Sequence, residues 1–204
     1  MSRERVPITF KTYPTLSRKY GETVCTAGVR EDGSWVRIYP VPFRRLEEAE
    51  QYRKFDWLEC GLIKSRTDPR PETHHPADMK QLNPVGHMDT GSNWRERRNL
   101  LLRRATVYAR WQALIDGAKA NTLSLAVFKP AKILGFVWEE ESREWDAGKL
   151  AEMRNQTNQT ELFAEDAWRK TFQVIPKLPY SLSYRFVDAD GRESQRAQSA
   201  KARA

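Results

Sequence analysis

A single stretch of the chain, residues 22–45 (ETVCTAGVREDGSWVRIYPVPFRR), constrains the fold more than any other. Within it, Asp32-Gly33 separates two runs rich in Val, Thr, Ile, Trp and Tyr, residue types that favour strands. Asp-Gly favours the type I′ turn, because both central residues of that turn adopt positive φ. The stretch therefore predicts a β-hairpin whose loop consists of Asp32 and Gly33.

A two-residue loop determines which residues of the hairpin lie opposite one another. The expected pairs are Glu31–Ser34, Arg30–Trp35, Val29–Val36, Gly28–Arg37, Ala27–Ile38 and Thr26–Tyr39. Side chains alternate between the two faces of a strand, so one face is expected to be apolar and made of Cys25, Ala27, Val29, Val36 and Ile38. The other face would carry Trp35, Arg37 and Tyr39, opposite residues too small to cover them.

Two rings beside a guanidinium on an uncovered sheet face suit a nucleic acid, because bases stack on rings and phosphates pair with cations. We therefore predict that Trp35 and Tyr39 stack on bases and that Arg37 contacts a base or a phosphate. The cations expected at the rim of this face are Arg44, Arg45, Arg66 and Arg70. Two alternatives stay open for the three residues: cross-strand pairing on a solvated face, or burial under a helix or a second sheet.

The charge balance favours a polyanionic partner. The 204 residues include 35 Lys and Arg against 27 Asp and Glu, which gives a net charge of +8 and a pI near 9.6. Nucleic acid is the first such partner and an acidic membrane surface the second. No apolar run approaches the length of a membrane span and the N-terminus has no signal sequence, so we expect a cytoplasmic protein without a membrane partner.

Residues 66–91 are the least periodic part of the chain and predict a long loop rich in proline and histidine. An alternative catalytic site uses Asp68, Glu72 and either His74 or His87 around a divalent ion, because these side chains are metal donors. Their spacing places no two ligands on one helical face, so we expect no metal and no cofactor. Pairing of Arg70 with a carboxylate would instead stiffen the DPRPE segment.

A single long basic helix is expected over residues 92–120, with Ser92 as its cap and helical residues from about 93 to 117. Aromatic and aliphatic residues recur on one side at heptad-like intervals and are expected to face the core. Six arginines, including Arg97, cover the remaining surface, with few acids among them. Such a surface suits phosphate contacts or an acidic protein partner, and it can equally be a solvated face.

These features divide the chain into five parts. Residues 1–65 are expected to form a first barrel-like half, followed by the loop at 66–91 and the helix at 92–120. Residues 121–190 contain further alternating segments and predict a second β-rich half. Residues 191–204 have no large apolar side chain and predict a disordered basic tail.

The chain resembles an uncharacterised bacterial family of paired OB-type barrels that is associated with mobile-element and conflict systems. The segments that carry the resemblance are KTYPTLSRKYGETVCTAG (11–28), WVRIYPVPFR (35–44), DPRPE (68–72) with Trp94 and Arg97, and LPYSLSYRFVDADG (178–191). OB-type barrels present one sheet face and its rim loops to single strands, so the resemblance implies single-strand binding in a defence or mobile-element system. The family has a further acidic, tryptophan-containing strand where this chain has its basic tail.

Together these observations predict an α+β, mainly β fold with two small OB-like barrels joined by a long helix. The expected function is the binding of single-stranded DNA or RNA, with Arg97 contributing a contact from the helix. A metal-dependent nuclease or nucleotide-processing enzyme and a protein-binding adaptor are the two other classes that stay open. No phosphate-binding loop, nucleophile elbow or zinc-deaminase signature is present, which favours a role without catalysis.

Overall fold

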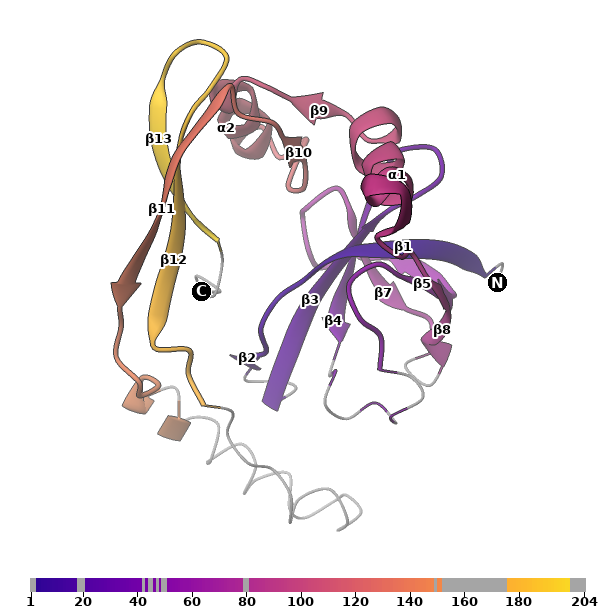
Figure 1. Cartoon of the computed structure of the whole chain (residues 1–204). Coiled ribbons are helices and arrows are strands. Elements are labelled where there is room, and N and C mark those ends of the chain that lie inside the picture. Colours follow the sequence, from indigo (N-terminus) through magenta and orange to yellow (C-terminus); the bar gives the residue numbers. More distant parts are fainter. Residues whose placement is uncertain are drawn as a thin grey trace.

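Strands dominate the computed structural model, which describes residues 3–17, 21–41, 43, 46, 48, 51–78, 81–148, 150–151 and 176–198 (Figure 1). The helices α1 (Gly91–Asn99) and α2 (Trp111–Lys119) are short. The fold is therefore mixed α and β with mainly β content, which confirms that part of the prediction. Over the described residues, no helix has the length and apolar character needed to cross a membrane.

The N-terminal half forms one eight-stranded sheet that curls on itself (Figure 1). Its strands are β1 (Glu4–Lys11), β2 (Thr15–Ser17), β3 (Gly21–Val29), β4 (Trp35–Val41), β5 (Asp56–Cys60), β6 (Leu62–Lys64), β7 (Thr73–Pro76) and β8 (Asn83–His87). They are hydrogen-bonded in the order β6-β7-β4-β3-β1-β5-β8, with β2 beside β3. The β4–β7 pair is parallel and the other pairs of this sheet are antiparallel.

The curl of this sheet originates in β1, which pairs with β5 through its first residues and with β3 through its last. A bulge between Ile8 and Phe10 lies within the β1–β3 pairing, next to the point where the pairing with β5 ends, and a bulge bends a strand and increases its twist. Gly28 of β3 lies against the bent strand so closely that a Cβ atom there would be 2.4 Å from Val6 Cγ1. The buried core of this half contains Val6, Ile8, Val36, Ile38, Val41, Leu58 and Leu82.

The predicted hairpin is present as β3 and β4, but its loop has three residues instead of two. Gly33 N donates to Arg30 O at 3.0 Å, and Gly33 adopts φ +86°. Glu31, Asp32 and Gly33 therefore form a type I turn closed by a left-handed glycine. Ser34 N donates to Asp32 Oδ1 at 2.8 Å and further stabilises the turn.

The longer loop moves the hairpin register by one residue, which corrects the predicted pairs. Arg37 lies opposite Ala27, and Trp35 lies opposite Val29. Residues that lie directly opposite one another in an antiparallel pair share a face. Trp35 and Arg37 are consequently on the same face as Ala27 and Val29, where the predicted register had separated them.

Residues 92–120 do not form a single helix, which corrects the prediction of a long basic helix. After α1 the chain makes a π-helical turn, η4 (Leu100–Arg104), and becomes extended at Ala105. The strand β9 (Val107–Tyr108) follows η4 and precedes α2. It pairs in parallel with β10 (Val127–Phe128), which comes after α2. Strand pairing at Val107 and Tyr108 interrupts the helical periodicity, because β-branched and aromatic residues also favour strands.

The C-terminal half contains a three-stranded antiparallel sheet of β11 (Lys132–Glu140), β12 (Tyr180–Val187) and β13 (Glu193–Gln198), in that order. β13 lies within residues 191–204, so the predicted disordered tail is wrong for residues 193–198. Similarly, β7 and β8 lie within residues 66–91, where a long loop was predicted. In each case main-chain pairing with a neighbouring strand stabilises a segment whose side chains carry little strand signal.

Candidate functional site

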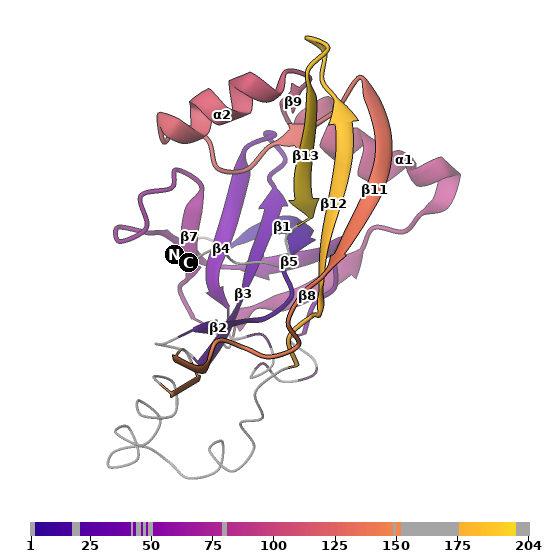
Figure 2. The same ribbon diagram turned by 90° about the vertical axis from the view of Figure 1, so that its left-hand side faces the viewer.

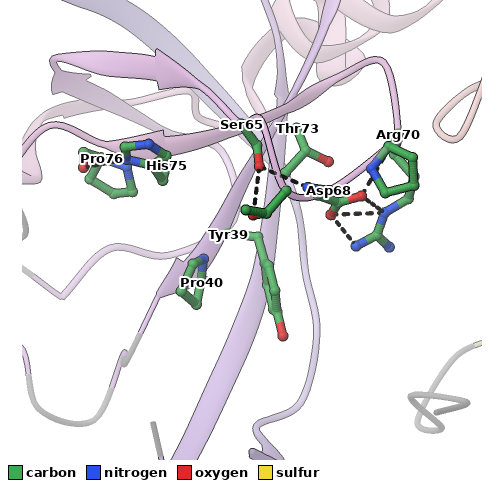
Figure 3. Close-up of a pocket in the computed structure, with 10 residues that line it drawn as sticks. Tyr39, Pro40, Ser65, Asp68, Arg70, Thr73, His75 and Pro76 are labelled. Carbon is green, nitrogen blue, oxygen red and sulfur yellow. Dashed lines mark hydrogen bonds and ion pairs between the residues drawn. The ribbon is translucent and has the colours of Figure 1, made fainter. Parts of the chain in front are cut away.

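An open pocket of about 700 Å³ lies between β4, β7 and the loop that joins β6 to β7 (Figure 3). Tyr39 and Pro40 come from the end of β4, and Thr73, His75 and Pro76 come from β7. The loop contributes Ser65, Thr67, Asp68, Pro69 and Arg70. Three of the residues singled out in the sequence, Tyr39, Asp68 and Arg70, are thus brought together.

An ion pair between Asp68 and Arg70 determines the shape of the loop. Arg70 Nε donates to Asp68 Oδ1 at 2.8 Å, and Arg70 Nη2 donates to Oδ2 at 2.5 Å. The Arg70 backbone N–H also donates to Oδ1, at 3.1 Å. These hydrogen bonds lower the pKa of Asp68 to about 2, against the smaller opposing effect of burial. The predicted pairing of Arg70 with a carboxylate inside DPRPE is confirmed.

This pairing uses the acceptor positions of the Asp68 carboxylate, but it does not use all the donors of the Arg70 guanidinium. A carboxylate has about four acceptor positions, and the backbone and guanidinium of Arg70 take them up. Over the described residues, Arg70 Nη1 has no hydrogen-bond partner, and the Arg70 side chain is 41% exposed. Asp68 therefore holds a guanidinium in place and leaves part of its donor edge free for a ligand.

Tyr39 and His75 complete the pocket. Figure 3 shows the Tyr39 ring and the Arg70 guanidinium on the same side of the loop, with the ring extending away from Ser65. His75 Nδ1 lies 3.2 Å from the carbonyl of Pro76, and it must donate because a carbonyl only accepts. This leaves His75 Nε2 as an acceptor in the neutral ring. An aromatic face, a fixed cation and an imidazole acceptor can together bind a planar, hydrogen-bonding anionic ligand such as a nucleotide.

Replacing Asp68 with asparagine should lower the free energy of unfolding by about 1 kcal/mol near neutral pH, a small value because Arg70 is partly solvated. The Asp68 pKa is lowered on folding, so its contribution is present above the unfolded value of about 3.9 and is lost as pH falls through about 2. Urea unfolding at about pH 7 and about pH 2.5 measures the change. The exposed Glu31→Gln is the control, and an equal loss in both variants would contradict this role of Asp68.

The loop is attached to the C-terminal half through the buried carboxylate of Glu72. Glu72 accepts hydrogen bonds from the Ser124 backbone N–H at 2.8 Å, the Ser124 hydroxyl at 2.5 Å and the Leu125 N–H at 3.4 Å. Asn121 Nδ2 donates to the carbonyl of Pro69 at 2.6 Å. These contacts fix the loop from behind, so Glu72 has a structural role and does not line the pocket.

Arg37 belongs to the same buried network, which corrects its predicted position on an uncovered face. It is only 8% exposed. Its Nη2 donates to the Ser124 hydroxyl at 3.0 Å, and its Nη1 lies 3.0 Å from Cys25 Sγ. Its backbone N–H donates to the carbonyl of Glu72 at 2.9 Å. A guanidinium engaged in this way is not available to a phosphate.

Trp35 is also displaced from the predicted site. It packs against a second buried cluster that contains Val29, Met88, Leu100 and Ala105. Its indole therefore joins the hairpin to η4 and the end of β8, and the predicted base-stacking role is not supported by its packing. Of the three residues predicted to form the uncovered face, only Tyr39 lines the pocket.

Arg97 lies in a separate cluster beside β8, which is at the opposite end of the strand order from β6 and β7. Its guanidinium carbon lies 4.0 Å from the centre of the Phe55 ring and 5.3 Å from that of Trp94. Its Nε donates to Met88 O at 2.9 Å, and its Nη2 donates to His87 Nε2 at 3.1 Å. Arg97 thus ties α1 to β8 and does not reach the pocket.

The remaining predicted site residues lie apart from one another. Arg66 is exposed beside Thr67 of the pocket, and Arg44 and Arg45 lie outside the described residues. His74 Nδ1 donates to Glu72 O at 2.8 Å, and His87 Nδ1 donates to Asp56 Oδ1 at 2.6 Å, so the two imidazoles belong to different clusters. Within the part of the chain that the structure describes, no group of three or more His, Cys, Asp or Glu residues could hold a metal ion.

Thr73 and His75 line the pocket but were not predicted to do so from the sequence. Both lie on β7, which the sequence assigned to an irregular loop. The only signal was the short run THHP after DPRPE, whose residues are too few to predict a strand. The parallel pairing of β7 with β4 places them beside Tyr39.

Comparisons with known proteins give two matches. Residues 2–103 match the family model described as domain of unknown function DUF8758. Residues 109–201 match a second family model, described as domain of unknown function DUF8757. No curated protein and no solved structure matches the chain.

Proposed function

We propose that this chain, which belongs to the family described as domain of unknown function DUF8758, binds single-stranded DNA or RNA through the pocket between β4, β7 and the β6–β7 loop. Tyr39 stacks on one base and Arg70 donates to the adjacent phosphate. Arg66 at the exposed edge adds a further cation. The observation that carries the proposal is the fixed, partly free guanidinium of Arg70 beside the ring of Tyr39.

The overall charge supports this assignment. A net charge of +8 attracts a polyanion at long range, and the pocket supplies the local contacts that a strand needs. Stacking on an aromatic ring tolerates any base, because every base has a π-face. The expected ligand is therefore a single strand bound with little sequence preference and with strong salt dependence.

The curled N-terminal sheet supports an OB-type barrel as the scaffold of this site. A small sheet approaches closure when one strand pairs on both sides around a bulge, as β1 does with β3 and β5. OB-type barrels bind single strands across one sheet face and its adjoining loops. The pocket combines strand residues of β4 and β7 with loop residues, which is the corresponding arrangement. The OB proposal concerns this first half.

Affinity for short labelled oligonucleotides tests the proposal. Fluorescence anisotropy at low salt should detect binding of single-stranded DNA or RNA, with weaker binding as salt rises. Tyr39→Ala and Arg70→Ala should each weaken binding by about tenfold, because a stacked base contributes about 1–3 kcal/mol and a charge-assisted phosphate contact a similar amount.

The matched control is Arg95→Ala, an exposed arginine of α1 that does not line the pocket. It removes the same charge as Arg70→Ala and should weaken binding by less than about threefold. If both arginine variants weaken binding equally, the interaction is non-specific attraction and the pocket is not the site. Undetectable binding of the wild-type protein at low salt would overturn the function itself.

A further inference from the structure

The three-stranded C-terminal sheet exposes a row of large apolar side chains on one face. Ile133, Phe136 and Trp138 of β11 are 61%, 50% and 60% exposed. Phe136 packs edge-on against Tyr184 with ring centres 5.2 Å apart, and Trp138 packs against Tyr180 at 5.9 Å. The rings are therefore ordered on the sheet and remain in contact with solvent, which is unusual for so many large apolar groups.

β11 is also an edge strand. Over the described residues it pairs only with β12, and Figure 2 shows it on one outer side of the sheet, with β12 between it and β13. Exposed edges offer unpaired backbone groups to another strand, and proteins usually shorten or disrupt them.

In the described part of the chain, the strands at the ends of the eight-stranded order and at the other edge of the three-stranded sheet carry such protection. β6 has three residues, β8 has five and contains Pro84, and β13 has the polar sequence ESQRAQ. β11 has nine residues, KILGFVWEE, without a proline. Among these four edge strands, β11 is the longest and carries the most large apolar side chains. A long apolar edge strand is suited to pairing with a strand of another chain.

We propose that β11 pairs antiparallel with β11 of a second copy of this chain, which joins the two C-terminal sheets into one six-stranded sheet. The sequence of the strand is complementary to itself when Phe136 lies opposite Phe136 of the other copy. Gly135 then lies opposite Val137, and both copies contribute the same surface, as a two-fold interface requires.

A bulge in β11 determines the rest of the register. Ile133 lies opposite Phe186 and Gly135 opposite Arg185, so Leu134 is the extra residue. When this residue is skipped, Ile133 of one copy lies opposite Trp138 of the other. Lys132 then lies opposite Glu139, which places opposite charges at both ends of the shared ladder.

This register also keeps the apolar residues together. Ile133 and Phe136 lie opposite Phe186 and Tyr184 of β12, so they share the aromatic face. A shift of one residue would place Phe136 opposite Val137 and join the aromatic face of one copy to the other face of its partner. A shift of two residues, centred on Val137, would place Ile133 opposite Glu140. Apolar pairing therefore favours the register centred on Phe136, whereas all three registers place Lys132 opposite a glutamate.

Sedimentation equilibrium from about 5 to about 500 μM tests the dimer, since one strand pair buries less area than the roughly 1,600 Å² of a typical stable interface. The wild-type protein should show a monomer–dimer equilibrium. Lys132→Glu should weaken it about fivefold, because it places like charges opposite each other twice per dimer. The double variant Lys132→Glu with Glu139→Lys should restore wild-type association.

Disulfide cross-linking tests the register. Phe136→Cys should form a cross-linked dimer on mild oxidation, because residue 136 lies opposite itself at a separation that a disulfide spans. Trp138→Cys should not, since it lies opposite Ile133, and the wild-type protein controls for Cys25 and Cys60. A monomer at every concentration overturns the proposal. A dimer that is insensitive to Lys132→Glu, or that cross-links at Val137→Cys instead of Phe136→Cys, also overturns it.

Discussion

Replacing Glu72 with alanine is expected to lower the free energy of unfolding by about 3–5 kcal/mol, one of the two largest effects that the structure predicts. The substitution removes the acceptor of the Ser124 N–H, the Ser124 hydroxyl and the Leu125 N–H. It also leaves Arg37 buried beside a serine that has lost its own partner. A buried donor without an acceptor has lost its hydrogen bonds to water and makes none within the protein, so it lowers the stability of the fold.

Urea unfolding measures the global effect, and amide hydrogen exchange at Ser124 and Leu125 measures the local one. Both amides should exchange faster in Glu72→Ala. Glu96→Ala is the control, because Glu96 is exposed on α1 and should change the unfolding free energy by less than about 0.5 kcal/mol. A loss of under about 1 kcal/mol in Glu72→Ala would show that the two halves are not held together by this carboxylate.

The second large effect is expected for Gly28→Ala, which should destabilise the protein by about 3 kcal/mol or more. A Cβ at this position would lie 2.4 Å from Val6 Cγ1 and 2.5 Å from the carbonyl oxygen of Pro7. The second contact is with backbone, so the bent part of β1 must move away from β3. Overpacking of this kind exceeds what rotamer changes can absorb.

Thermal unfolding followed by circular dichroism measures this change. For a chain of this length, about 3 kcal/mol corresponds to a fall in Tm of about 6–12 °C. Gly135→Ala is the matched control, because a Cβ at Gly135 meets no atom within 4 Å. It should leave Tm unchanged or raise it slightly, since alanine costs less entropy than glycine in a strand. Similar Tm values for the two variants would contradict the close approach of β1 and β3.

Several features of the structure could be predicted from residues that lie close together in the sequence. Asp32-Gly33 between two strand-favouring runs predicted the hairpin, and the structure contains it as β3 and β4. The proline-rich DPRPE segment predicted that Arg70 pairs with one of its two carboxylates, and the structure shows this pair with Asp68. Both features depend on residues a few positions apart, so the sequence contains nearly all the information needed.

The candidate site was only partly predictable. Tyr39 and Arg70 were identified and lie together, whereas Trp35 and Arg37 were assigned to the same surface and are covered by other parts of the chain. The error follows from one residue of register, because a strand places alternate residues on opposite faces. Nothing local distinguishes a two-residue Asp-Gly loop from a three-residue loop that ends in Gly33.

The chain by its own residues specifies a mainly β, strongly basic protein, with a turn at Gly33 and a stiff loop at 68–72. The packed fold decides the rest. Gly33 approaches η4 so closely that a Cβ would lie 2.1 Å from the carbonyl oxygen of Arg104, and this contact comes from a segment predicted to be helical. The hairpin register, the interrupted helix and the burial of Arg37 all depend on contacts between residues far apart in sequence, and local preferences of under about 1 kcal/mol per residue are too small to oppose them.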